Sequence, residues 1–317
     1  MKAAIVTVAG QAPVYGDFRG PVPVPGKSLV RVTAAAISHV TRGRASGRHY
    51  SASGALPFVP GVDGTGVTAD GKRVYFMAPE APYGSMAEVS LVDAEHLFAI
   101  PEGLSDDTAA AMAIPGMSSW AALVERAQLR SGETVLINGA TGTSGRLAIQ
   151  IARHLGAGKV IATARNVQAF EELRRLGADV TIALVPDRDA LEQAFKSEFQ
   201  HGVDIVLDYL WGVSAEALVI AAAKAGPEGR PIRYVEIGSM SGTTISLPGA
   251  ALRASALQLM GSGIGSVPLP RLLKAIQGVL EAAPAAGFKV AAAPMPLAEV
   301  ARAWAAPDTG ARIVLVP

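Results

Sequence analysis

Residues 135–150 read Val-Leu-Ile-Asn-Gly-Ala-Thr-Gly-Thr-Ser-Gly-Arg-Leu-Ala-Ile-Gln, and this stretch decides the fold class. The apolar run Thr134–Asn138 predicts a short buried strand, and the spacing of apolar residues over Ser144–Leu155 predicts a helix. Three glycines, each three residues from the next, lie at the turn between them. A strand, a glycine turn and a helix in this order are typical of the first βα unit of a dinucleotide-binding fold.

The glycine turn predicts a phosphate site. Glycine lets the backbone turn tightly and approach a pyrophosphate with no Cβ in the way, and a helix N-terminus presents free N–H groups to an anion. The spacing is Gly-x-x-Gly-x-x-Gly rather than Gly-x-Gly-x-x-Gly, and a purely structural turn is the alternative. Arg146 either reaches a phosphate or lies on the surface. The residues that we expect to contact the cofactor here are Gly139, Ala140, Thr141, Gly142, Thr143, Ser144 and Gly145.

Two other nucleotide-binding classes fit the sequence poorly. A P-loop is disfavoured because no Gly-Lys-Ser or Gly-Lys-Thr follows the turn. A short-chain dehydrogenase is disfavoured because no tyrosine is followed four residues later by lysine, and because the turn lies far from the N-terminus.

Strands and helices alternate from Glu133 onward, which predicts βαβ units and a parallel sheet covered by helices on both faces. The fold class is therefore α/β, with a doubly wound parallel-sheet dinucleotide-binding domain. The predicted strands are Thr134–Asn138, Val160–Ala164, Asp179–Ala183, Val203–Asp208, Ile232–Ile237 and Leu257–Gly261. The predicted helices are Ser144–Leu155, Val167–Leu176, Arg188–Phe199 and Ser214–Lys224.

The first third of the chain is rich in Gly, Pro and short β-branched runs, and it predicts a β-rich domain with few helices. The strands expected there are Lys2–Val8, Ser28–Ala34, Arg73–Phe76 and Ala87–Val92, with Pro21–Gly26 and Pro57–Gly66 as loops. Further elements are expected after Ser105: helices ending at Ala113 and spanning Ser118–Arg126, Leu269–Glu281 and Leu297–Trp304, and strands near Lys289–Ala292 and at Ala311–Val316.

Composition limits the class of protein. A chain of 317 residues predicts about two domains. Lys plus Arg number 28 and Asp plus Glu 27, so the chain lacks the cationic excess of a dedicated nucleic-acid binder. The absence of cysteine excludes disulfides, cysteine-held zinc, iron–sulfur clusters and thiol nucleophiles. No signal peptide and no apolar run near 18 residues is evident, so we expect a soluble, cytoplasmic protein.

The end of the second predicted strand indicates which nicotinamide cofactor binds. An acidic residue at this place binds the ribose hydroxyl of NAD, whereas an arginine suits the 2′-phosphate of NADP. The sequence here is Val-Ile-Ala-Thr-Ala-Arg-Asn over residues 160–166, with no carboxylate. A charge-assisted hydrogen bond contributes about 1.5–3 kcal/mol, which is roughly a 10- to 150-fold preference. We therefore expect NADPH, bound by Arg165 and Asn166; a solvated Arg165 is the alternative.

Taken together, these motifs resemble the medium-chain dehydrogenase/reductase superfamily, specifically its zinc-free quinone oxidoreductase branch. The resemblance covers essentially the whole chain, and it depends on the order and spacing of many short matches. Besides the glycine turn, they are Met1–Ala4, Val32–Ser38, Val59–Val67, Gly84–Glu88, Ile100–Ser105, Gly132–Ile137 and Gly310–Pro317.

The resemblance implies a domain organisation. Residues 1–117 and 267–317 would form a β-rich, partly barrel-like catalytic (substrate) domain, and residues 118–266 an inserted dinucleotide-binding domain, with the active site in the cleft between them. It also implies a homodimer paired through the strand Leu257–Gly261. No catalytic zinc is expected, because Ser38 and Val62 stand where zinc-dependent relatives have a cysteine and a histidine ligand.

The resemblance further implies hydride transfer from the nicotinamide to a quinone or to the β-carbon of an α,β-unsaturated carbonyl. Without a metal, alcohol oxidation would lack its usual Lewis acid, whereas these acceptors are already electrophilic. The expected catalytic residues are Tyr50, Ser38 and Thr41, with Tyr83 as a weaker candidate and water as an alternative proton source. His39 fits a proton relay or local packing, Asp63 a loop-organising acceptor, and Asp208 a turn residue or an acid.

The nicotinamide end of the cofactor is expected at loops that follow the carboxyl ends of strands. The residues expected there are Met117, Gly238, Ser239, Gly263 and Ile264, and Trp211 would either wall the site or pack in the core. Two other functions stay open: a metal-free NADPH carbonyl reductase, and a non-catalytic NADPH-binding protein of the crystallin-like or RNA-binding kind. Small-molecule turnover would separate the enzymes from the binding protein.

Overall fold

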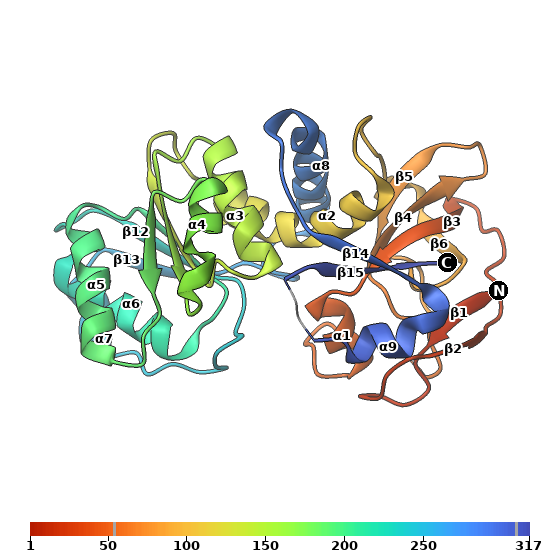
Figure 1. Ribbon diagram of the computed structural model, residues 1–317, viewed down its shortest axis with the longest axis horizontal. Coiled ribbons are helices and arrows are strands. Elements are labelled where there is room, and N and C mark those ends of the chain that lie inside the picture. Colours follow the sequence, from red (N-terminus) through yellow and green to blue (C-terminus); the bar gives the residue numbers. More distant parts are fainter. Residues whose placement is uncertain (53–54, 308–309) are drawn as a thin grey trace. The chain divides into compact units, whose positions relative to one another are not determined.

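The computed structural model describes residues 1–52, 55–307 and 310–317. The chain divides into two compact units, one formed by residues 1–114 and 276–317 and the other by residues 115–275 (Figure 1). The boundaries fall inside two helices, α2 (Asp106–Ala121) and α8 (Leu269–Ala286). Among the described residues, no helix is both long enough and apolar enough to cross a membrane.

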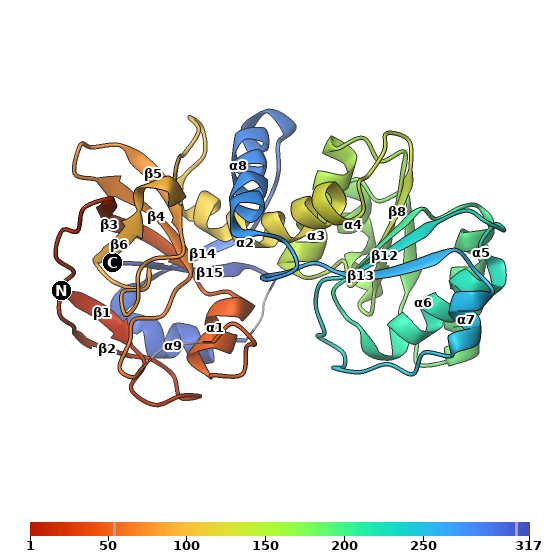
Figure 2. The same cartoon turned by 180° about the vertical axis from the view of Figure 1, so that it is seen from behind.

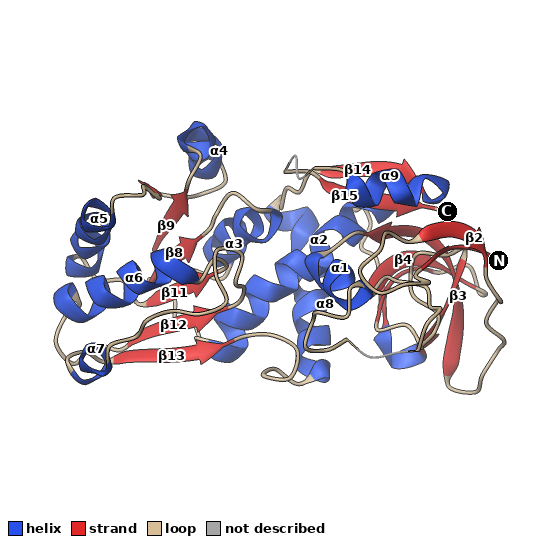
Figure 3. Ribbon diagram, turned by 90° about the horizontal axis from the view of Figure 1, so that it is seen from below, coloured by secondary structure: helices blue, strands red, loops and turns tan. Residues whose placement is uncertain are grey.

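The unit of residues 115–275 is built on a six-stranded sheet in which every neighbouring pair is parallel. Its order is β10-β9-β8-β11-β12-β13, so consecutive strands run outward from β8 first to one side and then to the other, as in a doubly wound fold. Figure 3 shows most of these strands side by side, and Figure 2 shows β13 next to β12. The strands are β8 (Thr134–Asn138), β9 (Lys159–Ala164), β10 (Val180–Ala183), β11 (Ile205–Asp208), β12 (Ile232–Glu236) and β13 (Leu257–Gly261). The predicted fold class is confirmed.

Helices cover both faces of this sheet. Leu136, Val206 and Tyr234 from three neighbouring strands pack with Phe195 and Leu218, which lie on α5 and α6. The opposite face is covered by α3, which contacts β8 and β9. The helices are α3 (Thr143–His154), α4 (Phe170–Arg175), α5 (Arg188–Gln200), α6 (Gly212–Ala225) and α7 (Gly249–Arg253), and a 3-10 turn (Val167–Ala169) precedes α4.

The unit of residues 1–114 and 276–317 contains a seven-stranded sheet and a two-stranded sheet, β1-β2. The larger sheet has the order β14-β15-β3-β4-β5-β7, with β6 also paired to β3. Its core includes Phe76, Met86 and Leu315, all fully buried. The strands are β1 (Lys2–Ile5), β2 (Val14–Asp17), β3 (Lys27–Ala36), β4 (Asp63–Thr68), β5 (Arg73–Met77), β6 (Val89–Asp93), β7 (Leu97–Ala99), β14 (Ala292–Pro296) and β15 (Arg312–Val316). The helices are α1 (His39–Ala45) and α9 (Val300–Ala305), with 3-10 turns at Ala94–His96 and Leu297–Glu299.

Part of the predicted loop Pro57–Gly66 is a strand. β4 begins at Asp63 although two of its six residues are glycine. A Cβ on Gly66 would lie 2.4 Å from the carbonyl oxygen of Arg31, and one on Gly64 would lie 2.9 Å from that of Ala34. These glycines therefore allow β4 to lie closely against β3, which is the role that a glycine inside a strand commonly has.

The two helices predicted up to Ala113 and over Ser118–Arg126 are one helix, which is a correction. α2 runs through Pro115, and a π turn, Ala122–Arg126, follows it. Proline removes a helical hydrogen bond, but residues 109–113 of this helix are almost completely buried, so tertiary packing outweighs its local cost.

The strand expected near Lys289–Ala292 begins at Ala292 instead and ends at Pro296. Its prolines are tolerated because β14 is the edge strand of its sheet, where a missing N–H costs no ladder bond. The helix α1 was not predicted at all, since its seven residues carry little apolar periodicity.

Candidate functional site

The three glycines of the turn between β8 and α3 have different surroundings. Gly139 has φ +91°, which favours glycine, and a Cβ there would lie 2.8 Å from Cγ of Leu210. A Cβ on Gly145 would lie 2.5 Å from the carbonyl oxygen of Gly139, so α3 packs directly on the turn. A Cβ on Gly142 would meet no described atom within 4 Å. The middle glycine therefore leaves open space above the backbone, where a phosphate can approach.

The N-terminus of α3 provides the donors for an anion. Gly142 is the N-cap residue, so no side chain accepts a hydrogen bond from the first turn of the helix. The first turn also carries no acidic residue that would repel a phosphate. Free N–H groups and the positive end of the helix dipole are therefore available to a negatively charged ligand.

Hydrogen bonds from Arg146 connect the turn to α4. Its guanidinium donates to both carboxylate oxygens of Glu172, at 3.0 and 2.9 Å, and to the carbonyl oxygen of Thr141. The guanidinium therefore joins the turn to α4 and is not freely solvated, and a contact with phosphate stays a prediction.

Arg165 and Asn166 follow the carboxyl end of β9, and both are exposed. β9 is the neighbour of β8, so Arg165 and the glycine turn leave the same edge of the sheet. The Asn166 side chain accepts a hydrogen bond from the backbone N–H of Gln168 at 3.0 Å, which caps the 3-10 turn before α4. A cationic side chain beside the turn, with no carboxylate in residues 160–166, suits a 2′-phosphate.

Asp208 ends β11 as a buried acceptor. Its Oδ1 accepts from the backbone N–H groups of Leu210 and Trp211, at 2.9 and 3.1 Å, and its Oδ2 accepts from the hydroxyl of Tyr234 at 2.6 Å. Burial raises the pKa of Asp208, while these hydrogen bonds oppose the rise. The arrangement matches the turn role rather than that of an acid open to substrate. It also holds Trp211 at φ +57°, a strained conformation for a residue with a side chain.

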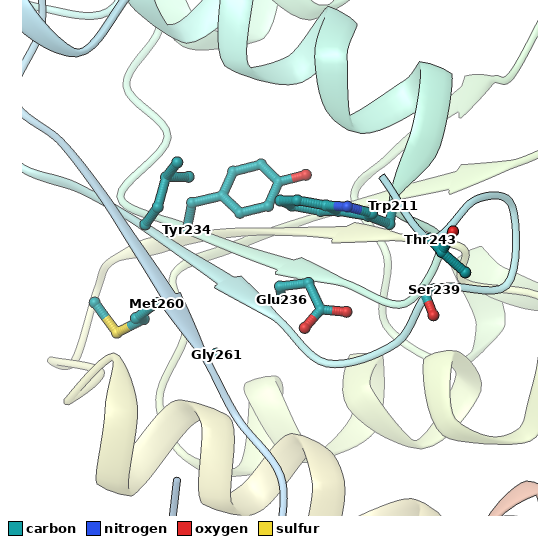
Figure 4. A pocket seen from close by; sticks show the side chains of 8 residues that line it. Trp211, Tyr234, Glu236, Ser239, Thr243, Met260 and Gly261 are labelled. Atoms are coloured by element: carbon teal, nitrogen blue, oxygen red, sulfur yellow. The ribbon is translucent and has the colours of Figure 1, made fainter. Parts of the chain in front are cut away.

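A cavity of about 420 Å³ is lined by the carboxyl halves of β12 and β13 and by the segments that follow β11 and β12 (Figure 4). Trp211 and Tyr234 meet edge to face on one side of it, with ring centroids 6.3 Å apart. Burial and the nearby charge of Asp208 raise the pKa of Glu236, the acidic residue of the lining. The lining residues are Trp211, Tyr234, Glu236, Ser239, Thr243, Leu259, Met260 and Gly261. The sequence analysis named Trp211 and Ser239 but missed Glu236, since this residue lies within the predicted strand Ile232–Ile237 and belongs to no motif.

The other residues expected around the nicotinamide lie in the same unit. Gly238 and Ser239 follow β12, whereas Gly263 and Ile264 follow β13, so both loops leave the carboxyl edge of the parallel sheet. The backbone N–H of Gly263 donates to Oγ of Ser266 at 2.8 Å, which closes a tight turn. Met117 is buried in α2.

The structure brings two of the three expected catalytic residues together. Ser38 is the N-cap of α1, and its Oγ accepts from the backbone N–H of Thr41 at 3.0 Å. The two hydroxyl oxygens are 2.9 Å apart, and the residues are only 4% and 1% exposed. Tyr50 lies outside this pair: it is 72% exposed and its ring stacks on His49 at 4.3 Å.

The weaker candidates have different surroundings. Tyr83 meets the ring of Phe18 edge to face, with centroids 6.3 Å apart. His39 is the first residue of α1 and is exposed. Asp63 is fully buried, its Oδ2 accepts from the hydroxyl of Tyr75 at 3.0 Å, and burial raises its pKa to about 7. In residues 1–52, 55–307 and 310–317, no group of three metal-ligating side chains is placed to hold an ion.

Comparison with known proteins identifies the family. Residues 145–281 match the family described as zinc-binding dehydrogenase. The chain is 34% identical to a probable NADPH-dependent quinone reductase, tdiC, of Emericella nidulans, and the match covers 100% of both chains. It is similar in structure to the quinone oxidoreductase of Thermus thermophilus, with a TM-score of 0.82, 25% identity and 100% of each chain covered. A probable oxidoreductase of Mycobacterium abscessus has a TM-score of 0.79 at 28% identity, covering 100% of this chain and 99% of that one. The chain belongs to the medium-chain dehydrogenase/reductase superfamily, in its quinone oxidoreductase-like branch.

Proposed function

We propose that this chain is an NADPH-dependent oxidoreductase that transfers a hydride to a quinone or an α,β-unsaturated carbonyl, with no metal ion taking part. The observation that carries this proposal is an open glycine turn together with Arg165, the residue that follows the neighbouring strand β9. The full-length similarity to a probable NADPH-dependent quinone reductase supports the choice of a quinone among the electrophilic acceptors.

The residues present fit a dinucleotide phosphate. The backbone from Gly139 to Gly145 would hold the pyrophosphate at the N-terminus of α3, because Gly142 leaves that approach open. Arg165 and Asn166 would bind the 2′-phosphate. Met117, Gly238, Ser239, Gly263 and Ile264 would position the nicotinamide ring. Bound NADPH supplies the hydride itself, and the protein supplies binding and orientation.

The hydroxyl pair of Ser38 and Thr41 is our candidate for stabilising the negative charge that develops on the acceptor oxygen. Two hydroxyl groups carry two protons, and one of these is used in the hydrogen bond between them. The second proton remains to be donated, from a pair whose oxygens are fixed by the N-terminus of α1. A donor fixed in advance costs no reorganisation during the reaction. Tyr50 would contact the substrate.

The absence of metal catalysis is inferred from residue types. Ser38 and Val62 occupy the places of a cysteine and a histidine ligand in zinc-dependent relatives, and a hydroxyl and an isopropyl group are poor ligands for Zn²⁺. Without a Lewis acid, acceptors that are already electrophilic are favoured over alcohols.

A homodimer and a cytoplasmic location complete the proposal. β13 is an edge strand of its sheet, and among the described residues it pairs only with β12. An open edge can pair with the same strand of a second copy.

Turnover with purified protein tests the function. The absorbance of the reduced nicotinamide would be followed with NADPH and with NADH, against a quinone panel, an enone panel and an aldehyde, with a chelator present throughout. We expect chelator-insensitive turnover of quinones or enones that prefers NADPH. Turnover of the aldehyde alone would move the assignment to a carbonyl reductase, and NADPH binding without turnover of any acceptor would favour a non-catalytic protein.

The hydroxyl pair offers a matched control for the same assay. Thr41→Val keeps the shape of the side chain but removes one hydroxyl, so the Ser38 hydroxyl loses the neighbour that fixes the direction of its proton, whereas Thr41→Ser keeps both hydroxyls. We expect the valine variant to lose kcat with the quinone while its NADPH affinity stays unchanged, and the serine variant to retain most activity. Equal activity in both variants would exclude a role for the pair.

A further inference from the structure

A chain of buried hydrogen bonds lies directly beneath the glycine turn. The backbone N–H of Gly139 donates to Oγ1 of Thr163 at 3.0 Å, and the Thr163 hydroxyl donates to Oδ1 of Asn138 at 2.8 Å. The Asn138 amide nitrogen then donates to Oδ1 of Asp208 at 2.8 Å. The side chains of Thr163 on β9, Asn138 on β8 and Asp208 on β11 are completely buried. Residues 24 to 70 positions apart in sequence are joined in this way.

The direction of every hydrogen bond in this chain is determined. A backbone N–H can only donate, so the Thr163 oxygen accepts from Gly139 and the single Thr163 proton points to Asn138. The Asn138 carbonyl faces Thr163, which turns its NH₂ group toward Asp208 and toward Oγ of Ser214, 2.9 Å away. Asp208 receives this donor as well as the hydroxyl of Tyr234. No member of the chain can reverse its role without leaving a buried group unpaired.

Thr163 is attached to the turn twice. Besides its hydroxyl contact with Gly139, its carbonyl oxygen accepts from the backbone N–H of Ala140 at 2.9 Å. β9 ends at Ala164, and Arg165 is the next residue. The same residue therefore ties the phosphate-binding turn to the strand end that presents the arginine.

We propose that Thr163, supported by Asn138, is a positioning residue that sets the separation between the glycine turn and Arg165, and thereby the preference for NADPH over NADH. This inference rests on the proposed function, since it needs the pyrophosphate on the turn and the 2′-phosphate on Arg165. Neither side chain touches the cofactor, because both are buried below the backbone that would bind it.

The chemistry of position 163 makes the proposal testable with two variants. Thr163→Val keeps the shape of the side chain but removes the hydroxyl, so Gly139 loses its acceptor and Asn138 loses its donor. Thr163→Ser keeps the hydroxyl and is the matched control. The charge-assisted contact between Arg165 and the 2′-phosphate corresponds to roughly 10- to 150-fold in affinity, and a displaced turn would weaken it. We expect the valine variant to bind NADPH 10- to 100-fold more weakly and NADH only a few-fold more weakly.

The experiment measures the dissociation constants of NADPH and NADH for the wild type, T163V, T163S, Arg165→Ala and the double variant T163V/R165A. If Thr163 acts through Arg165, the two substitutions are not additive: once Arg165 is absent, T163V no longer changes the ratio of the two dissociation constants. T163S is expected to keep the wild-type ratio.

Equal weakening of both cofactors by T163V, or a double variant in which the two effects on the ratio multiply, would overturn the inference and leave Thr163 with a purely structural role. If T163V does not fold, Asn138→Ala carries the comparison, because it removes the acceptor that orients the Thr163 hydroxyl while the contact with Gly139 is kept. Failure of the proposed function has a different signature, because the wild type itself would then show no preference for NADPH.

Discussion

The first and third glycines of the turn touch protein, whereas the middle one faces open space, and this difference predicts opposite results for two alanine substitutions. In Gly142→Ala, the added methyl group meets no described atom within 4 Å, and φ at this position is −70°, which alanine adopts freely. In Gly145→Ala, the methyl group would lie 2.5 Å from the carbonyl oxygen of Gly139 and 2.6 Å from Cα of Ala140. Both neighbours are backbone atoms, so they cannot rotate away.

The magnitudes follow from these distances. At position 142, alanine makes the unfolded chain less flexible, which raises the free energy of unfolding by about 0.4–1 kcal/mol. Alanine is also a poorer N-cap residue than glycine, which lowers the free energy of unfolding by about 0.5–1 kcal/mol. The unfolding free energy of G142A should therefore stay within about 0.5 kcal/mol of the wild type. Overpacking at Gly145 should cost about 1–3 kcal/mol. G142A should lose one charge-assisted contact to phosphate, which corresponds to an NADPH affinity lower by roughly 10- to 150-fold.

Thermal unfolding and NADPH titration of the two variants provide the assay. G142A should melt within about 2 °C of the wild type and G145A several degrees lower, since 1 kcal/mol shifts the Tm of a domain this size by about 2–4 °C. G142A should nevertheless bind NADPH weakly. Unchanged NADPH affinity in G142A would refute the phosphate role of the turn, and equal melting temperatures for the two variants would refute the packing argument.

Three further predictions concern single residues. Arg165→Asp should weaken NADPH binding at least 10-fold more than NADH binding, because it replaces the cation with a like charge to the 2′-phosphate; equal losses would remove Arg165 from the site. The pKa of Asp63 is raised by burial to about 7, so the stability contributed by its neutral form is complete below pH 4 and is lost as the pH rises through 7. In urea unfolding, the wild type should lose on the order of 3 kcal/mol of unfolding free energy between pH 5 and pH 8. Asp63→Asn cannot ionise and should not show this loss; the same pH profile in both proteins would contradict this pKa. Tyr50→Phe should raise KM for the quinone without changing Tm, since this side chain is 72% exposed; an unchanged KM would show that its hydroxyl does not contact the substrate.

The parallel-sheet unit is the part of the fold that the sequence predicts best. Its central strands β8 and β11 are short apolar runs that end at Asn138 and Asp208, and β8 has the predicted bounds, Thr134–Asn138. The local signals agree there with the tertiary structure, because a strand buried on both faces must be apolar throughout. The glycine turn can also be predicted from the sequence, because its backbone conformation and its close contacts require glycine.

The features that could not be predicted depend on contacts between distant segments. The strand β4 is made possible by a close approach to β3, which its own glycines do not reveal. The helix through Pro115 persists because its neighbours are buried. Glu236 joins a cavity only after three strands have been placed side by side. Thr163 and Asn138 give no signal in the sequence, and only their positions on adjacent strands make them partners.

The return of the chain to its first unit has a consequence for biosynthesis. β3 pairs with β15, whose residues 312–316 are synthesised more than 270 residues after β3, so the larger sheet of this unit lacks a strand until they emerge. Residues 115–275 form a continuous unit, and they can collapse as soon as they emerge. The order of folding is therefore expected to differ from the order of synthesis: residues 115–275 fold first, and β3, although translated earlier, has an unpaired edge until β15 emerges.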